Sequence, residues 1–125
     1  MRLTKEQINL LFTDISARLP YGLIFHTIVG DYKMTGIIIS NGYVYLDCPI
    51  YEPGDDCFVP EYLEECRPYL RSMLSMTPEE SNELFQLAGK GNDIERMNFY
   101  YSHYLDINSL IPKGLAIEAL PGMYT

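Results

Sequence analysis

The chain has 125 residues, a formal net charge of -8 at pH 7, 47% hydrophobic residues and no tryptophan. This length and composition predict a single domain, residues 1–125, with a hydrophobic core of its own. The excess of acidic residues excludes proteins that hold nucleic acid through phosphate contacts, because such proteins need a surplus of Lys and Arg. No apolar run approaches the roughly 20 residues of a membrane-spanning helix, so we expect no membrane partner.

Three cysteines are an odd number, so they cannot all pair within the chain. Because the N-terminus also does not resemble a secretory signal, we predict a cytoplasmic protein. Cys48, Cys57 and Cys66 are nine residues apart, whereas structural zinc sites usually take two ligands about two to four residues apart. We therefore predict no metal site and no cofactor.

The N-terminal segment predicts an amphipathic helix. Thr4 and Gln7 match the capping box that starts a helix. Apolar residues then recur at helical spacing, and Arg18 falls on the opposite side, which we expect to face solvent. Pro20 is expected to end the helix, just before Gly22. The apolar stripe consists of Ile8, Leu11, Phe12, Ile15 and Leu19.

From residue 23 to residue 48 the hydrophobic period changes from about 3.6 to 2, and β-branched and aromatic residues dominate. This pattern predicts three strands, at residues 23–29, 34–40 and 43–48. Asn41 and Gly42 join the last two strands and suit a type I′ turn, because both central residues of that turn need a positive φ.

The two-residue turn also fixes the register of its hairpin, with Ser40 opposite Tyr43. One face carries Ile38, Tyr43 and Tyr45, which is too apolar for simple exposure. We expect the C-terminal helices to cover this face, since buried aromatic residues in small domains are usually structural. A protein partner is the alternative. The other face is expected to lie on the core and carries Ile37, Ile39, Val44 and Leu46.

Residues 49–65 hold six acidic residues and no basic residue. We predict a short strand at residues 57–59 and a single helical turn at residues 61–66. The acids do not follow the spacing of an EF-hand, so a solvated loop is expected. It is also a candidate surface for a basic partner. The acids are Glu52, Asp55, Asp56, Glu61, Glu64 and Glu65.

Two helices are predicted in the C-terminal half. Residues 77–80 form a second capping box with proline at the first helical position, and Gly89 ends that helix. Asn92 can cap the next helix. The apolar tail is predicted to be extended, with an edge strand at residues 115–118. The expected class is α+β: a small antiparallel β-meander, of which a partial SH3-like barrel is one form, with an N-terminal helix and two C-terminal helices.

No set of residues predicts a catalytic site. Ser102, His103 and Asp106 suggest a hydrolase triad, but neighbouring side chains on a helix point about 100° apart, so we expect no hydrogen bond between Ser102 and His103. Residues 89–91 lack the spacing of a P-loop and predict a turn. The alternative function is a small enzyme or ligand-binding domain that uses His26 or His103 in a cleft between sheet and helices.

The chain resembles a family of short hypothetical proteins of Bacteroides-type gut bacteria and their prophages. The resemblance is carried by three segments: ARLPYG at residues 17–22, RPYLR followed by SMT within residues 67–77, and LIPKGLAIEA at residues 110–119. It implies a phage or mobile-element accessory protein, and it assigns no activity and no residue role.

The second of these segments contains two arginines outside the predicted elements. We expect Tyr69 and Leu70 to anchor the crossover from sheet to helices. Arg67 and Arg71 are expected to pair with the acids that precede them, in surface contacts worth at most about 1 kcal/mol.

The sequence therefore predicts a non-enzymatic protein-interaction module with a protein partner. The candidate surfaces are the aromatic face and the acidic segment defined above. A homodimer is a further way to use an uncovered tyrosine face or a free edge strand. The candidate interaction residues are Ile38, Tyr43, Tyr45, Asp55, Asp56, Glu61, Glu64 and Glu65.

Overall fold

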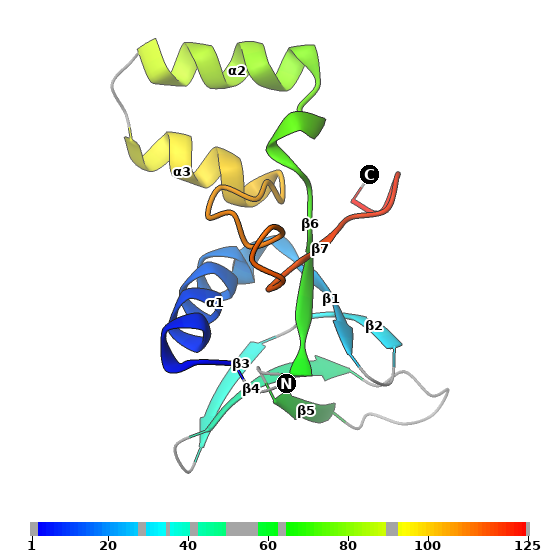
Figure 1. The fold of residues 1–125 in the computed structure, drawn as a ribbon. Helices are drawn as coiled ribbons and strands as arrows, with labels where there is room; N and C mark the ends of the chain where they lie inside the picture. Colours follow the sequence, from blue (N-terminus) through cyan, green and yellow to red (C-terminus); the bar gives the residue numbers. More distant parts are fainter. Residues whose placement is uncertain are drawn as a thin grey trace.

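The structure is a computed structural model with an N-terminal helix, two sheets and two C-terminal helices (Figure 1), which confirms the predicted α+β class. For residues 38–40, 43–49 and 58–62 it describes the backbone only. The described residues are 3–27, 30–34, 36–40, 43–49, 58–62, 65–89 and 93–124.

Helix α1 spans Lys5–Arg18, and the predicted capping box is confirmed: Gln7 N donates to Thr4 Oγ1 at 3.1 Å, and Thr4 N donates to the Gln7 side chain at 2.9 Å. The helix runs into a 3-10 turn at Leu19–Tyr21 that contains the predicted proline. Gly22 then reverses the chain with a φ of 73°, a conformation that favours glycine.

The prediction that Arg18 faces solvent is wrong. Its side chain is fully buried, and its Nε donates to Asp14 Oδ1 at 2.6 Å. Its Nη2 donates to the carbonyl of Leu105 at 2.8 Å, and its guanidinium lies over the Tyr101 ring. Asn108 donates to the other Asp14 oxygen at 2.7 Å. The residues that bury Arg18 lie far along the chain, so helical spacing alone could not reveal them.

One sheet has four strands in the order β2-β1-β6-β7. The predicted first strand, residues 23–29, contains β1, Ile24–Thr27, which pairs with β2, Gly30–Lys33, a strand that the sequence did not predict. Gly30 and Asp31, which the sequence suggested would close the first strand, are instead the start of β2, and Thr27 Oγ1 donates to Gly30 O at 2.9 Å. β6, Arg67–Leu70, was not predicted; it pairs antiparallel with β1 and parallel with β7, Ile117–Glu118.

The other sheet has three strands, β3 at Gly36–Ser40, β4 at Tyr43–Pro49 and β5 at Phe58–Tyr62. Ser40 pairs with Tyr43, as the predicted turn requires, so the register is confirmed. The turn residues themselves lie outside the described residues. β5 begins near the predicted fourth strand and continues through Tyr62, so residues 61 and 62 are strand where the sequence predicted a helical turn. Glu65 does lie in a 3-10 turn, and residues 63 and 64 lie outside the described residues.

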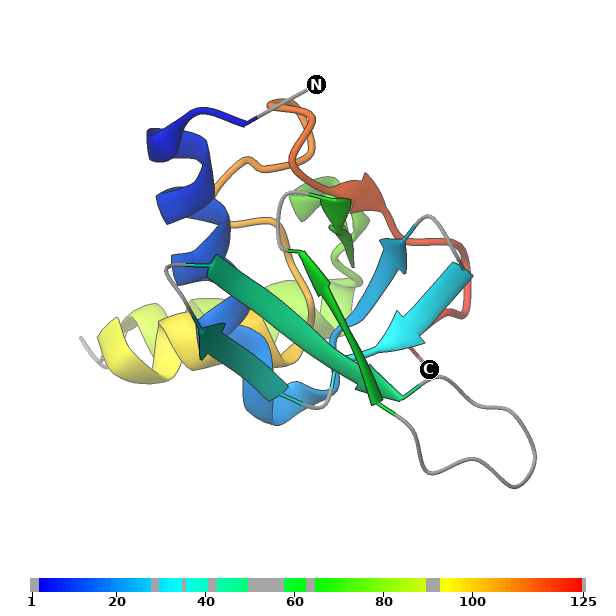
Figure 2. The ribbon, with the colours of Figure 1, turned by 90° about the horizontal axis from the view of Figure 1, so that it is seen from below.

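The two sheets lie next to each other, with β2 in contact with β4 (Figure 2). Among the described residues, no strand ladder joins them. The partial barrel suggested by the sequence therefore stays a prediction.

The core lies between α1, the four-stranded sheet and the irregular chain after the last helix. Leu11 and Ile15 of α1 meet Phe25 of β1 and Leu70 of β6. The C-terminal segment closes this core with Leu110, Leu115 and Ala116. β7, which pairs with β6, thus holds the C-terminal segment against the core.

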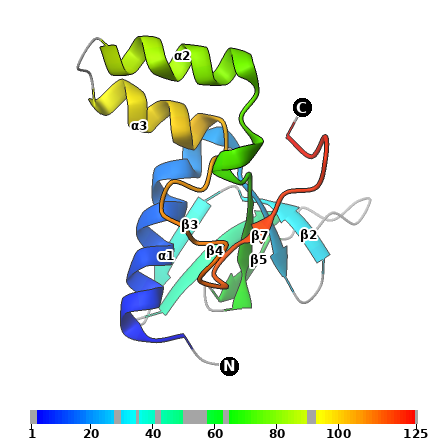
Figure 3. The same ribbon diagram turned by 45° about the horizontal axis from the view of Figure 1, so that its top comes forward.

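Helices α2, Pro78–Gly89, and α3, Asp93–Ser102, form an antiparallel hairpin at one end of the molecule (Figure 3). The three-stranded sheet lies at the opposite end (Figure 1). The prediction that these helices cover the Tyr43 and Tyr45 face is therefore wrong. Within the described part of the chain, no helix is long and apolar enough to cross a bilayer.

Candidate functional site: a cavity at the base of the helical hairpin

A cavity forms where β6 leaves the sheet and meets the end of α3. The backbone N–H of Arg71, directly after β6, donates to Tyr104 O at 2.7 Å, and Asp106 N donates to Arg71 O at 2.9 Å. This exchange holds the segment before α2 against the segment after α3. The sequence predicted both segments as connections and gave no signal that they pair.

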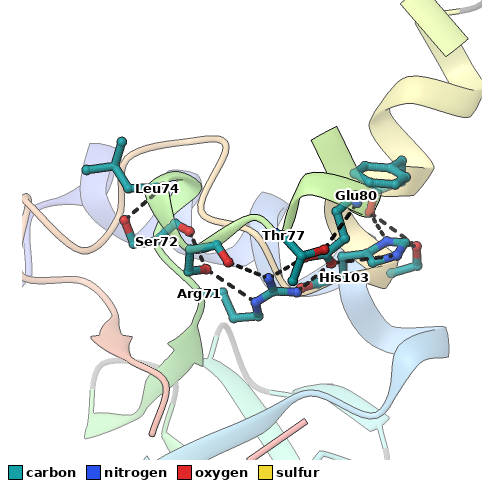
Figure 4. A network of polar contacts seen from close by, with 9 residues as sticks. Arg71, Ser72, Leu74, Thr77, Glu80 and His103 are labelled. Atoms are coloured by element: carbon teal, nitrogen blue, oxygen red, sulfur yellow. Dashed lines mark hydrogen bonds and ion pairs between the residues drawn. The ribbon is translucent and has the colours of Figure 1, made fainter. Parts of the chain in front are cut away.

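Arg71 is the centre of the polar wall of this cavity (Figure 4). Its Nη1 and Nη2 donate to the two oxygens of Glu80 at 2.8 and 2.7 Å. The remaining donors reach Ser75 Oγ at 3.3 Å, Ser75 O at 3.1 Å and His103 O at 3.3 Å. A guanidinium has five N–H groups, so every donor of Arg71 is engaged within the protein. The expected pairing with preceding acids is wrong for this arginine.

Glu80 is held as a carboxylate by its neighbours. The hydrogen bonds from Arg71 lower the pKa of Glu80 to about 2. The same carboxylate accepts the N–H of Thr77 at 2.9 Å, and Glu80 N donates to Thr77 Oγ1 at 3.1 Å, which confirms the second capping box. The sequence identified Glu80 as a capping residue but not as the partner of Arg71.

His103 lies at the end of α3 with one ring nitrogen turned toward Glu80. Its Nδ1 is 2.9 Å from Phe99 O and its ring stacks on the Phe99 ring at 4.1 Å. Its Nε2 is 3.9 Å from Glu80 Oε2. The contact with Phe99 O fixes the ring, so Nε2 is the nitrogen available to a ligand.

The expectation that Ser102 and His103 share no hydrogen bond is wrong, because Ser102 Oγ lies 3.2 Å from His103 Nδ1. Both side chains converge because each reaches back to the Phe99 carbonyl at the helix end. Asp106 does not complete a triad. Its two carboxylate oxygens accept the N–H groups of Leu110 and Ile111 at 2.7 and 2.9 Å.

Stacked tyrosines form the aromatic wall. Tyr104 occupies the left-handed position after α3 with a φ of 59°, where glycine is more usual. Its ring lies 3.7 Å from that of Tyr124, at an angle of 8°. Tyr124 donates its hydroxyl to Tyr69 O at 2.7 Å and accepts from Ile24 N at 3.0 Å. Burial raises the pKa of both stacked tyrosines, so both keep their protons at neutral pH.

The cavity has a volume of about 600 Å³, within the range of small-molecule sites. Glu118 of β7, an exposed residue, is a second acidic residue of the lining. The polar side is lined by Arg71, Ser72, Ser75, Thr77, Glu80, Ser102 and His103. The apolar side is lined by Tyr104, Ala119, Leu120, Pro121, Gly122, Met123 and Tyr124.

His26, the other predicted histidine, lies away from this cavity on the four-stranded sheet. Its Nδ1 is 2.7 Å from Asp31 Oδ1, and Tyr69 donates its hydroxyl to both Asp31 oxygens at 3.0 and 3.1 Å. The His26 side chain is 52% exposed, so it faces solvent rather than a cleft. Of the two histidines that the sequence offered, the structure places His103 in a concave site.

The predicted interaction surface is only partly described. Glu65 is exposed. Cys66 is buried in the core, and the described residues contain no group of three His, Cys, Asp or Glu that could hold a metal ion. The side chains of Ile38, Tyr43, Tyr45 and Glu61, and residues Asp55, Asp56 and Glu64 as a whole, lie outside the described part.

Comparison with known proteins gives no assignment. No family model matches the chain, and neither a curated protein nor a solved structure matches it. The resemblance to the Bacteroides and prophage family therefore stays a prediction. The chemistry of the cavity is the basis on which a function can be inferred.

Proposed function

We propose that the protein is a non-enzymatic binding module whose cavity takes a small organic amine with an apolar body. The observation that carries this proposal is the charge of the lining. Arg71 is the one Lys or Arg among the described residues of the lining and is neutralised by Glu80, while Glu118 adds a further negative charge. The phage or mobile-element context implied by the family resemblance is a proposal that is compatible with such a module.

An anionic ligand fits this lining poorly. To bind Arg71, a carboxylate or phosphate would have to displace Glu80 from two short hydrogen bonds. It would also be repelled by Glu118 and by the chain's net charge of -8. A protonated amine fits this lining better than an anion, because the carboxylate of Glu118 and the Nε2 atom of His103 can both accept hydrogen bonds from it.

The rest of the lining favours an apolar ligand body. Leu120, Pro121 and Met123 line the cavity, together with Tyr104 and Tyr124, whose rings are stacked. Burial of apolar ligand surface against such a wall supplies affinity, and a few polar groups fix the orientation.

The polar groups favour binding over nucleophilic catalysis. Ser102 donates its hydroxyl to Phe99 O at 3.2 Å, and the same carbonyl lies 2.9 Å from His103 Nδ1. An activated serine needs a base that is oriented by a third group. Asp106, the nearest acid in sequence, is bound to backbone N–H groups of its own turn.

The test is calorimetric titration with three probes that share one apolar body: naphthylmethylamine, naphthalenemethanol and naphthoate. We expect the amine to bind at least about tenfold more tightly than naphthoate, because only the amine complements the carboxylates. Glu118→Gln should remove most of this preference, whereas Glu6→Gln, on the exposed first turn of α1, should preserve it. Equal affinity for the amine and naphthoate, or an unchanged preference in Glu118→Gln, would refute the proposal.

A further inference from the structure

The α2–α3 hairpin exposes an unusual amount of large apolar side chain. Leu74, just before α2, is 96% exposed, and Phe85 of α2 and Ile94 of α3 are each 76% exposed. They are three of the five large apolar residues that are exposed in the described part of the chain. We call the exposed faces of the hairpin together with these three residues the hairpin surface.

Helix α2 is anchored to the body through its first turn, but its side chains are not buried by the rest of the fold. None of its residues is buried, and its neighbour in the fold is α3 (Figures 1 and 3). A helix of this length is marginal in water unless it packs against something. Here the bond between Arg71 and Glu80 and the capping box at Thr77 fix its first turn to the body. The fold thus presents a preformed helix whose apolar residues face water.

The charge of the hairpin surface indicates what can cover it. Arg96 is the one basic residue of the two helices and is bound to Asp93 at 2.8 Å. A second copy of the chain would bring the same negative charge to the contact, and like charges across an interface oppose binding. A partner with basic residues around an apolar stripe matches both features. Apart from Glu80, which is bound to Arg71 in the cavity wall, the acidic residues of the two helices are Glu79, Glu83, Asp93 and Glu95.

We propose that the hairpin surface docks a cationic amphipathic helix of a partner protein. Its apolar stripe packs on Phe85 and Ile94, and its Lys and Arg side chains lie against the acids of α2 and α3. This proposal is independent of the cavity. It gives the predicted protein-interaction role a location at the opposite end of the molecule from the three-stranded sheet.

The probe is a synthetic helical peptide with a leucine stripe and lysines on its flanks, and the matched control peptide carries glutamates in place of the lysines. Binding is measured by fluorescence anisotropy. We expect the lysine peptide to bind and the glutamate peptide not to bind. The double variant Phe85→Ser with Ile94→Ser should bind the lysine peptide about tenfold more weakly.

The matched control is Leu19→Ser, which removes a partly exposed leucine outside the hairpin; it should keep wild-type affinity. Circular dichroism and denaturation confirm that each variant is folded. The proposal is overturned if the double variant binds as tightly as the wild type, or if Leu19→Ser weakens binding equally. It is also overturned in favour of self-association if the wild type is a dimer that the double variant converts to a monomer.

Discussion

The carboxylate of Glu80 links the first turn of α2 to the segment that follows β6. Its pKa falls from an ordinary value of 4.5 to about 2 because Arg71 hydrogen-bonds to the charged form. A carboxyl group whose pKa is lower in the folded state stabilises the fold fully above its unfolded pKa. That contribution is lost as the pH falls from about 4.5 toward about 2.

Glu80→Gln tests this link. The change keeps the shape of the side chain but removes its charge, so we expect a loss of about 2 kcal/mol at pH 7, typical of hydrogen bonds to a charged group. Urea denaturation at pH 7 and pH 3 measures it. The variant should lose less stability than the wild type between the two pH values. Glu79→Gln, on the exposed side of the same turn, should have the same stability as the wild type at both pH values. If Glu80→Gln also had wild-type stability at both pH values, the charge of Glu80 would not have the role described above.

The buried pair of Arg18 and Asp14 makes a second prediction. Arg18→Met leaves the Asp14 carboxylate buried with Asn108 as its remaining partner, and such a change costs about 3–5 kcal/mol. Combining it with Asp14→Leu should restore part of the loss, because no charge then stays buried. Arg96→Met, at an exposed pair, should change stability by less than about 1 kcal/mol. A double-mutant cycle by urea denaturation measures all three, and a small effect of Arg18→Met alone would contradict this account.

Single side chains were predictable where their partners are local. The two capping boxes were found because Thr4 and Gln7, like Thr77 and Glu80, meet within one helical turn. The burial of Arg18 depends on the carbonyl of Leu105, 87 residues away in the chain. The spacing of apolar residues along one helix contains no information on a contact with such a distant residue.

At the scale of elements, the part of α2 beyond the first turn that Arg71 anchors is expected to open independently of the rest of the fold. A helix without buried residues contributes little to the cooperative core, so its amides should exchange through local opening. Thr77→Ala removes the cap and should raise exchange in residues 82–89 about fivefold, the equivalent of about 1 kcal/mol, with global stability nearly unchanged.

Hydrogen exchange followed by NMR measures this effect. Thr4→Ala removes the equivalent cap of α1, whose Leu11 and Ile15 are in the core, and should lower global stability by about 1 kcal/mol. If the two substitutions lowered global stability equally, α2 would belong to the cooperative unit after all.

Among the helices and strands too, those specified by neighbouring residues were predicted, whereas a strand that depends on distant parts of the chain was missed. The register of β3 and β4 followed from a two-residue turn, and the N-terminal helix followed from its cap and its proline. β6 was missed because it contains Pro68, a residue that usually argues against a strand interior. It exists because β1 and β7, more than 40 residues away on either side, pair with it.

At the scale of the whole molecule, the cavity is a product of tertiary structure. The chain after β6, the end of α3 and the C-terminal segment each supply one wall. The sequence singled out His103 but offered no reason to place Arg71, Glu80 and Glu118 beside it. Their proximity follows from β7 adding to β6, and from the backbone of Arg71 pairing with the chain on either side of Leu105.

Binding of a cationic ligand in this cavity is tested by an NMR titration of the isotope-labelled protein with naphthylmethylamine. We expect saturable shift changes at the amides of residues 71–77, 102–104 and 118–123, and little change around His26 and Asp31. Changes spread over acidic residues throughout the surface, or confined to sites away from the cavity, would contradict the claim.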